Sequence, residues 1–288
     1  KEHLFKDLNN DAERDEVLAL IANADILLTN FKSGDAEKFG MERERLWETN
    51  PKLIIGHILG FRSDPDRVAY DVVLQAETGF MSMNGQQGGD PVKMPVALID
   101  VLAAQQLKEG LMLALWQREK TGKGQYVEIS LEEAALSALV NQGSNYLMTG
   151  DVPQKMGSLH PNIAPYGDVF KCSDGEQIVL AIGTEKQFNT LCDLIEASDL
   201  PKDPRFSSNQ SRVQNRSDLQ MELAKALERF ERDSILEKLI TSKVPCAAIR
   251  NLEEVFSRQV AQDMVLEEEV NGKTTKRPAS KAFRISSY

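Results

Sequence analysis

The sequence contains little cysteine and little histidine. Its three cysteines and three histidines are widely separated, and they form neither a CxxC pair nor an HExxH spacing. Zinc sites and disulfide frameworks depend on such spacings, so the sequence predicts neither a metal site nor a disulfide. Free thiols indicate a reducing compartment, and we expect the cytoplasm or an organelle matrix.

Long apolar runs and an excess of positive charge are also missing. No apolar run approaches the ~20 residues of a membrane span, and the polar start KEHLFKDLNNDAERDE is unlike a signal peptide. The formal net charge of −10 does not suit a protein that binds nucleic acid. The sequence therefore predicts a soluble protein with neither a membrane nor a nucleic-acid partner.

The common nucleotide-binding loops do not occur. The chain contains no GxxxxGK[ST] and no GxGxxG after an expected strand. Nucleoside triphosphates and a standard dinucleotide site therefore lack support from the sequence.

The stretch Met94 to Leu115 has a clear pattern. An apolar run, expected to be a strand, ends at Asp100, and Leu107 and Leu111 then recur at helical spacing. Asp100 is therefore expected at or near a helix N-cap, where it would contribute ~1 kcal/mol as a cap. On this local pattern alone, a structural role is favoured. Small residues suited to close helix packing are Ala103, Ala104, Gly110 and Ala114.

Two helix and strand units precede this stretch. Helices are expected over 13–23 and over 36–49, the second with a weak point at Gly40, and buried strands over 24–29 and 52–59. This alternation indicates a parallel sheet with helices on both faces, which binds ligands at the carboxyl ends of its strands. Those ends are Asn30-Phe31 and Gly60-Phe61.

Further elements of the first domain lie on either side of Asp100. A helix over 70–83 precedes it, and a strand over 125–129 then leads to a helix over 131–148, which Ser130 caps.

The rest of the chain predicts a second, smaller α+β domain. Further on, Thr184 and Ser217 are expected to cap helices, and two hairpins are expected, the second across Asn271-Gly272. The predicted divisions are a Rossmann-like α/β domain over 1–148, a linker over 149–165, a small α+β domain over 166–262 and a return arm over 263–288.

Seven separated stretches together resemble the family III CoA-transferases, the group that includes formyl-CoA:oxalate and carnitine CoA-transferases. They occur in family order from Ala24 to about Val270. The stretches are ADILLTNFKSG, NPKLIIGHILGF, AYDVVLQAETGFMSMNG, PVALIDVLAAQ, LWQREKTGKGQYVEISLEEAALSAL, GSLHPNIAPYGDVFKCSDG and RVQNR.

The resemblance implies that Asp100 is the catalytic aspartate. A carboxylate can form both a mixed anhydride and a thioester, which the transfer of CoA between two acids requires. A helix N-terminus is expected to keep Asp100 ionised and to place N–H donors beside developing oxyanions. Coenzyme A would be a co-substrate. The partners would be an acyl-CoA, a small carboxylate and a second chain in an interlocked homodimer. The chain is most similar to family members that act on short dicarboxylates.

The resemblance also assigns the binding residues. CoA would contact Asn30, Phe31, Lys38, Tyr70 and Leu131. The acyl substrate would contact Tyr70, Gln75 and His160. Lys38 stands where the family often has an arginine, and a lysine remains a competent phosphate partner.

The chain departs from the family pattern at several positions. Ala104 replaces a usual glycine, NFKSG replaces NFRPG, and GFRSDPDR replaces a GFGxxGP turn, so the outer wall of the acyl pocket is expected to be remodelled. No stretch of this sequence matches the family's first strand or its last segment. Activity is therefore expected to belong to a longer parent chain if this one is incomplete.

Two other interpretations remain open from the sequence. A 2-methylacyl-CoA racemase shares the fold and uses a His and an Asp as an acid/base pair, for which His57 and Asp71 would serve. Its GHDxNY stretch reads AYDVVLQAETG here, however, and His57 lies in an apolar strand. The other alternative is a non-catalytic CoA-binding fragment.

Overall fold

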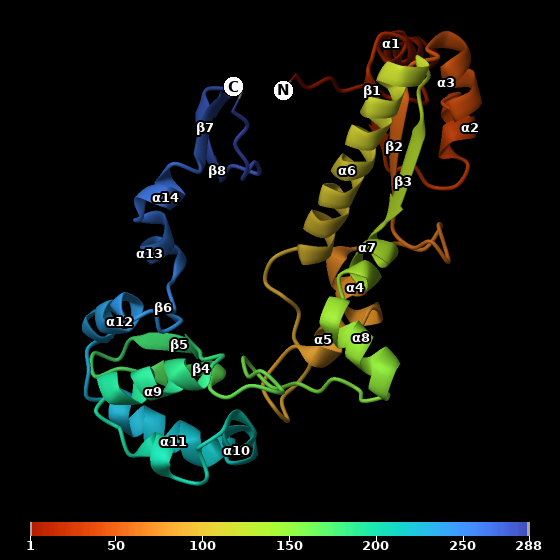
Figure 1. The fold of residues 1–288 in the computed structure, drawn as a ribbon. Coiled ribbons are helices and arrows are strands. Elements are labelled where there is room, and N and C mark those ends of the chain that lie inside the picture. Colours follow the sequence, from red (N-terminus) through yellow and green to blue (C-terminus); the bar gives the residue numbers. More distant parts are fainter. Residues whose placement is uncertain (1, 287–288) are drawn as a thin grey trace. The chain divides into compact units, whose positions relative to one another are not determined.

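Two units make up the chain, Lys1–Gly157 and Ser158–Tyr288. The computed structural model describes residues 2–286, and Figure 1 draws its helices and strands. The boundary between the units falls inside the range 149–165 that the sequence predicts as a linker. The domain limits drawn from the sequence stay predictions.

A parallel sheet of three strands forms the centre of the first unit. Its strands are β1 (Ile26–Thr29), β2 (Ile54–Leu59) and β3 (Tyr126–Ser130), in the order β1-β2-β3. Thr29 pairs with His57, and Leu59 pairs with Ser130, so the carboxyl ends of the strands share one edge. The predicted parallel sheet is confirmed.

The helix α6 (Leu98–Thr121) covers one face of this sheet. Glycines permit the close approach, since a Cβ added to Gly56 would lie 3.2 Å from Leu111 Cδ2, and one added to Gly110 only 2.6 Å from Val127 Cγ1. A short turn joins α6 to β3, so α6 runs antiparallel to the strands, as Figure 1 shows in yellow. A helix of 24 residues is about 36 Å long, whereas a strand of five spans about 17 Å. The first turn of α6 therefore extends past the carboxyl edge of the sheet.

Shorter helices complete the first unit. Glycines in the left-handed conformation interrupt two predicted helices, over 36–49 at Gly40 and over 70–83 at Gly79. The helix predicted over 131–148 is likewise interrupted, with Val140 at φ 40°. The helices are α1 (Asp11–Ile21), α2 (Asp35–Phe39), α3 (Arg43–Thr49), α4 (Asp71–Glu77), α5 (Phe80–Met83), α7 (Leu131–Ser137) and α8 (Val140–Thr149).

The strand expected to end at Asp100 is wrong. Residues 91–97 have no regular structure, and α6 has its N-cap at Ala97, which makes Asp100 the third residue of the helix. Proline at 91 and at 95 removes two backbone donors that a strand would need. The expectation for small residues fails only at Ala104, which is exposed.

The second unit is built on an antiparallel sheet in the order β4-β5-β6. Its strands are β4 (Tyr166–Lys171), β5 (Gln177–Ala181) and β6 (Cys246–Ala248), with a separate hairpin of β7 (Val265–Val270) and β8 (Lys273–Pro278). Its helices are α9 (Glu185–Leu194), the 3-10 helix η1 (Leu200–Lys202), α10 (Asn209–Gln214), α11 (Arg216–Leu227), α12 (Arg232–Thr241), α13 (Leu252–Phe256) and α14 (Gln259–Gln262).

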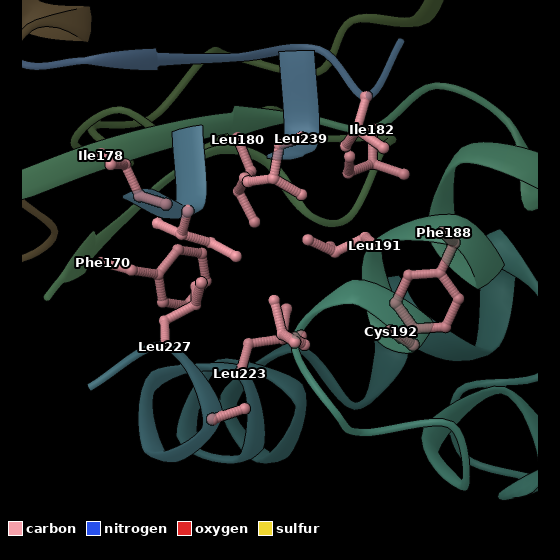
Figure 2. Packing of buried hydrophobic residues seen from close by; sticks show 14 of the residues in the cluster. Phe170, Ile178, Leu180, Ile182, Phe188, Leu191, Cys192, Leu223, Leu227 and Leu239 are labelled. Atoms are coloured by element: carbon pink, nitrogen blue, oxygen red, sulfur yellow. The ribbon is translucent and has the colours of Figure 1, made fainter. Parts of the chain in front are cut away.

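One continuous hydrophobic core holds the sheet and helices of this unit together. Figure 2 shows Phe170 and Leu180 from the sheet turned toward Leu191 of α9 and Leu223 of α11. Leu180, Leu191 and Leu223 are fully buried. Burial of apolar area is the main source of stability for such a unit.

Most of the helix caps and hairpins predicted for the second unit are present in the structure. Thr184 and Gln187 form the predicted capping box of α9, and both predicted hairpins are confirmed. The predicted cap at Ser217 is wrong, because Asn215 ends α10 and begins α11 at once, so that Ser217 lies inside the first turn. In the described residues, no helix has both the length and the apolar character that a membrane span requires.

Candidate active site

The first turn of α6 exposes Asp100 beside a buried neighbour. Ile99 is 0% exposed and packs with Phe61, Leu74 and Ala135, which come from the end of β2, from α4 and from α7. Asp100 itself is exposed. The packing of Ile99 therefore fixes the backbone from which the carboxylate of Asp100 projects.

Two side chains of α4 hold this turn. Asp71 Oδ2 accepts hydrogen bonds from the backbone N–H of Ile99 at 2.7 Å and of Asp100 at 3.3 Å. Its other oxygen, Oδ1, accepts a hydrogen bond from Gln75 Nε2. Gln75 is fully buried, and its Oε1 accepts from the backbone N–H of Met94 at 2.8 Å. A chain of hydrogen bonds thus connects the segment before α6 with its first turn.

The N–H donors of residues 98–101, in the first turn of α6, are engaged. Besides the two that bind Asp71, the N–H of Leu98 donates to Val96 O at 2.8 Å and that of Val101 to Ala97 O at 3.2 Å. The expectation that this turn supplies free N–H donors to an oxyanion is therefore wrong. Partial burial, followed by the charge of Asp71, raises the pKa of Asp100 above its ordinary value.

Tyr70 and Leu131 lie at the same edge of the sheet. Tyr70 is the N-cap of α4, directly before Asp71, and 68% of it is exposed. Leu131 follows β3 as the first residue of α7 and packs against the cluster that contains Ile99. The structure thus brings four predicted site residues, Asp100, Gln75, Tyr70 and Leu131, to one end of the first unit.

The predicted CoA loop follows β1. Phe31 packs its ring 5.9 Å from that of Phe39, and it lines a cavity of about 510 Å³. Lys38 is exposed, with Nζ 4.9 Å from the Phe39 ring centroid, and Asn30 is also exposed. Of these predicted CoA residues, Phe31 alone belongs to the described lining of the cavity.

A polar cluster on the sheet face opposite α6 was not predicted. His57 is 9% exposed and forms a 2.8 Å hydrogen bond between Nδ1 and Thr29 Oγ1. Its ring stacks on Tyr126 at 6.2 Å, and the Tyr126 hydroxyl donates to Glu128 at 2.8 Å. Burial lowers the pKa of His57, although Glu128 opposes this shift. His57 on β2 and Tyr126 and Glu128 on β3 alternate with apolar residues in the sequence, which indicates that they lie on one face of their strands. The register between the two strands, which the sequence does not state, brings them together.

The loop after β2, where the sequence departs from the family pattern, is tied to α7. The backbone N–H of Arg62 donates to Glu132 at 2.9 Å, and its guanidinium pairs with Glu133 at 2.9 Å. The same guanidinium pairs with Glu128 of the polar cluster. Ion pairs at exposed sites contribute little singly, so their effect here is to define where this loop lies.

His160 belongs to the second unit. Its ring meets Tyr166 edge-on at 5.1 Å, and its Nδ1 accepts from the backbone N–H of Asn162 at 3.2 Å. Arg216 donates to the carbonyls of His160 at 2.6 Å and of Ile163 at 2.8 Å. The arginine that ends the RVQNR motif thus fixes the loop that carries His160.

A parallel sheet with an exposed carboxylate at a helix start beyond its carboxyl edge defines an α/β protein with a candidate nucleophile. The family model for CoA-transferase family III matches residues 1–286, and the chain belongs to that family. The resemblance seen in the sequence is confirmed.

Known relatives agree with this assignment. The chain is 32% identical to the succinate–glutarate CoA-transferase of Agrobacterium fabrum, over 84% of this chain and 60% of that protein. It is 33% identical to the succinyl-CoA:mesaconate CoA-transferase of Haloarcula hispanica, over 89% of this chain and 65% of that protein. The chain thus spans less than two thirds of the length of either relative.

A solved structure shares the fold. The chain superposes on a CaiB/BaiF family protein from Brucella suis with a TM-score of 0.84 and 33% identity, over 98% of this chain and 74% of that one. In the described part of the chain, no group of three or more His, Cys, Asp or Glu residues is arranged to hold a metal ion.

Proposed function

We propose that the protein transfers coenzyme A from an acyl-CoA thioester to a small carboxylic acid, with Asp100 as the covalent nucleophile. The observation that carries the proposal is the exposed carboxylate of Asp100 in the first turn of α6. Family membership supports it. Because the chain covers only part of its relatives, the activity is a proposal for this chain or for a longer protein that contains it.

Two acyl exchanges on one carboxylate account for the transfer. Asp100 attacks the thioester carbonyl, the C–S bond breaks, and an acyl-aspartyl anhydride and CoA thiolate form. The thiolate attacks the aspartyl carbonyl, giving aspartyl-CoA and releasing the first acid. The acceptor carboxylate then attacks the aspartyl-CoA carbonyl, the C–S bond breaks, and a second anhydride and CoA thiolate form. The thiolate attacks the acceptor's acyl carbon in this anhydride, and the C–O bond to Asp100 breaks. The products are a new acyl-CoA and free Asp100, and no water is consumed.

The engaged donors of α6 limit how the oxyanion of each step is stabilised. The N–H groups of residues 98–101 already have acceptors. Since oxyanion donors must be aimed at the reacting oxygen, they have to come from other elements. The exposed hydroxyl of Tyr70, next to Asp71, is one candidate that the first unit supplies.

For CoA we propose contacts with Asn30, Phe31, Lys38, Tyr70 and Leu131. Asn30 and Leu131 each follow the last residue of a parallel strand, where ligands of such sheets bind. The exposed ammonium of Lys38 is suited to a phosphate.

For the acyl group we propose Tyr70, Gln75 and His160. Gln75 would act through Asp71, because both of its polar atoms are already bonded. Similarity to relatives named for succinate, glutarate and mesaconate suggests short dicarboxylic acids as substrates.

The structure disfavours the racemase alternative. His57 lies on the sheet face opposite α6 and is bonded to Thr29, whereas Asp71 is bonded to the first turn of α6. Each group is thus already engaged in a hydrogen bond, which does not support the acid/base pair that a racemase requires.

A trapping experiment tests the proposal. The protein is incubated with succinyl-CoA and no acceptor, treated with hydroxylamine, and digested for peptide mass analysis. A hydroxamate on Asp100 is expected, and Asp100→Asn should give none, with transfer reduced by several orders of magnitude. Asp90→Asn, an acid on the exposed loop before α6, is the matched control and should keep the adduct. Absence of the hydroxamate from the parent protein would leave the non-catalytic alternative. Racemisation of a 2-methylacyl-CoA by Asp100→Asn would favour the isomerase.

We also propose a homodimer in a reducing compartment. Exposed apolar side chains on α6 and α8, among them Trp116, Leu147 and Met148, support a partner surface. Sedimentation at micromolar concentration should give the mass of two chains.

A further inference from the structure

The helix that carries Asp100 lacks a cap of its own. Its N-cap residue is Ala97, whose side chain cannot accept a hydrogen bond, and the preceding segment has no regular structure. Four N–H groups at a helix start lack intrahelical partners, and an uncapped start frays. A helix that must hold a nucleophile in one orientation requires another acceptor.

Asp71 supplies that acceptor from a different helix. It is the first residue of α4 and precedes Asp100 by 29 positions, yet one of its oxygens accepts from both Ile99 N and Asp100 N. Gln75, one turn further along α4, donates to its other oxygen and is itself anchored to Met94 N. The carboxylate of Asp71 is therefore fixed on both sides.

We propose that Asp71 is a positioning residue for Asp100, and that its carboxylate replaces the missing N-cap of α6 and holds the first turn in its reactive orientation. The inference rests on the proposed role of Asp100 as nucleophile. Its electrostatic consequence is that a second negative charge faces the nucleophile. When Asp100 attacks the thioester its charge moves to the leaving sulfur, and the repulsion between the two carboxylates is relieved. A repulsion that is weaker in the transition state than in the ground state accelerates the step.

Other charges around α6 are engaged elsewhere. On the elements that pack against α6, the charged groups with described partners are Glu77 with Arg67, Glu128 and Glu133 with Arg62, Glu132 with the Arg62 N–H, and His57 with Thr29. After partial burial, Asp71 is the group that raises the pKa of Asp100. A change in the charge at position 71 should therefore be felt directly by Asp100.

The test compares Asp71→Asn with Glu77→Gln. Asp71→Asn keeps the shape and an acceptor oxygen but removes the charge, and its new amide faces the amide of Gln75. We expect the hydroxamate on Asp100 to form at least tenfold more slowly and the pKa of Asp100, followed by carbon NMR titration, to fall. Exchange of the Ile99 and Asp100 amide hydrogens should become faster. Glu77→Gln removes an exposed acid from the same helix and should change none of these quantities.

A rescue variant separates positioning from general damage. Ala97→Asp introduces a cap within α6 itself, and in the Asp71→Asn background it should restore slow amide exchange and at least part of the adduct rate. If Asp71→Asn fails to fold, the same measurements apply to Gln75→Leu, which keeps the charge of Asp71 but removes its lateral donor. Faster exchange and slower adduct formation are expected there too.

The outcomes distinguish this inference from the proposed function. A parent protein that forms no adduct contradicts the nucleophilic role of Asp100, while the titration and the amide exchange still report on Asp71. An Asp71→Asn protein with the parent's pKa for Asp100 and the parent's amide exchange would overturn the inference, even if the adduct forms more slowly.

Discussion

The two units of the chain are stabilised in different ways. In the second unit, 19 buried residues form one cluster. In the described part of the first unit, buried hydrophobic residues form three smaller clusters of five, four and four residues, and Ile54 and Ala114 belong to none of them. A side chain truncated inside the large cluster leaves a cavity within a continuous core, and such cavities lower the free energy of unfolding.

The candidate active site belongs to the unit with the small clusters. Ile99 belongs to one of them, and the turn that it anchors is completed by polar links from Asp71 and Gln75. In the second unit, polar links instead fasten a loop to a core that is already continuous, as Arg216 does at His160. In the first unit, polar links therefore complete the turn that carries Asp100, whereas in the second unit they fix a loop on a continuous core.

The largest effect on stability is expected from the core of the second unit. Leu223 of α11 is 0% exposed, and Leu223→Ala should lower the free energy of unfolding by about 2 to 5 kcal/mol. Met221 on the same helix is 64% exposed, and Met221→Ala should stay within about 0.5 kcal/mol of the parent. Urea unfolding measures both. Equal losses in the two variants would contradict a single continuous core.

Helices and strands were predictable where one segment carries the whole signal. The run KLIIGHIL is long and apolar enough to indicate β2, and the recurrence of Leu107 and Leu111 indicates α6. Caps were predictable where acceptor and donor are three residues apart, as at Thr184 and Gln187. These features depend on sequence neighbours, which periodicity and capping rules describe.

The candidate site was predictable only in part. The resemblance placed Asp100, but the partner that holds its helix is 29 positions away, and no local rule connects Asp71 with Ile99 and Asp100. The sequence predicts the N-cap at or near Asp100, and it does not indicate that the N-cap is Ala97, whose side chain cannot accept a hydrogen bond. The cluster of His57, Tyr126 and Glu128 depends on the register between β2 and β3, which the sequence does not state.

A smaller effect is expected from removing Lys38 from the proposed CoA site, with a lysine of the second unit as the control. Lys38→Ala should weaken the binding of a CoA ester by about 1 to 2 kcal/mol, because a charge-assisted contact with a phosphate is lost. The loss should shrink at high salt, since exposed charges are screened. Lys225→Ala removes an exposed lysine from α11 of the second unit and matches the change in net charge. Isothermal titration with CoA measures both, and equal losses would remove Lys38 from the site.

The smallest effect on stability is expected from replacing His57. This replacement tests the polar face of the sheet in the first unit, for comparison with the apolar core of the second unit. Burial lowers the pKa of His57 in the folded state below the ordinary histidine value of about 6.5, so the unfolded chain binds more protons in the window just below that pH. Stability should therefore fall as the pH drops from 6.5 through the folded pKa. His57→Gln should remove this part of the pH dependence of the unfolding free energy.

His3→Gln is the matched control for this measurement. His3 is exposed near the start of the chain, whereas His57 is 9% exposed and bonded to Thr29. Urea unfolding at several pH values between about 5 and 7 should give the parent slope for His3→Gln and a flatter slope for His57→Gln. If both variants keep the parent slope, the imidazole of His57 is as free to take up a proton in the folded protein as in the unfolded chain. The polar face of the sheet would then be open to water, and the first unit would depend on its three small clusters alone.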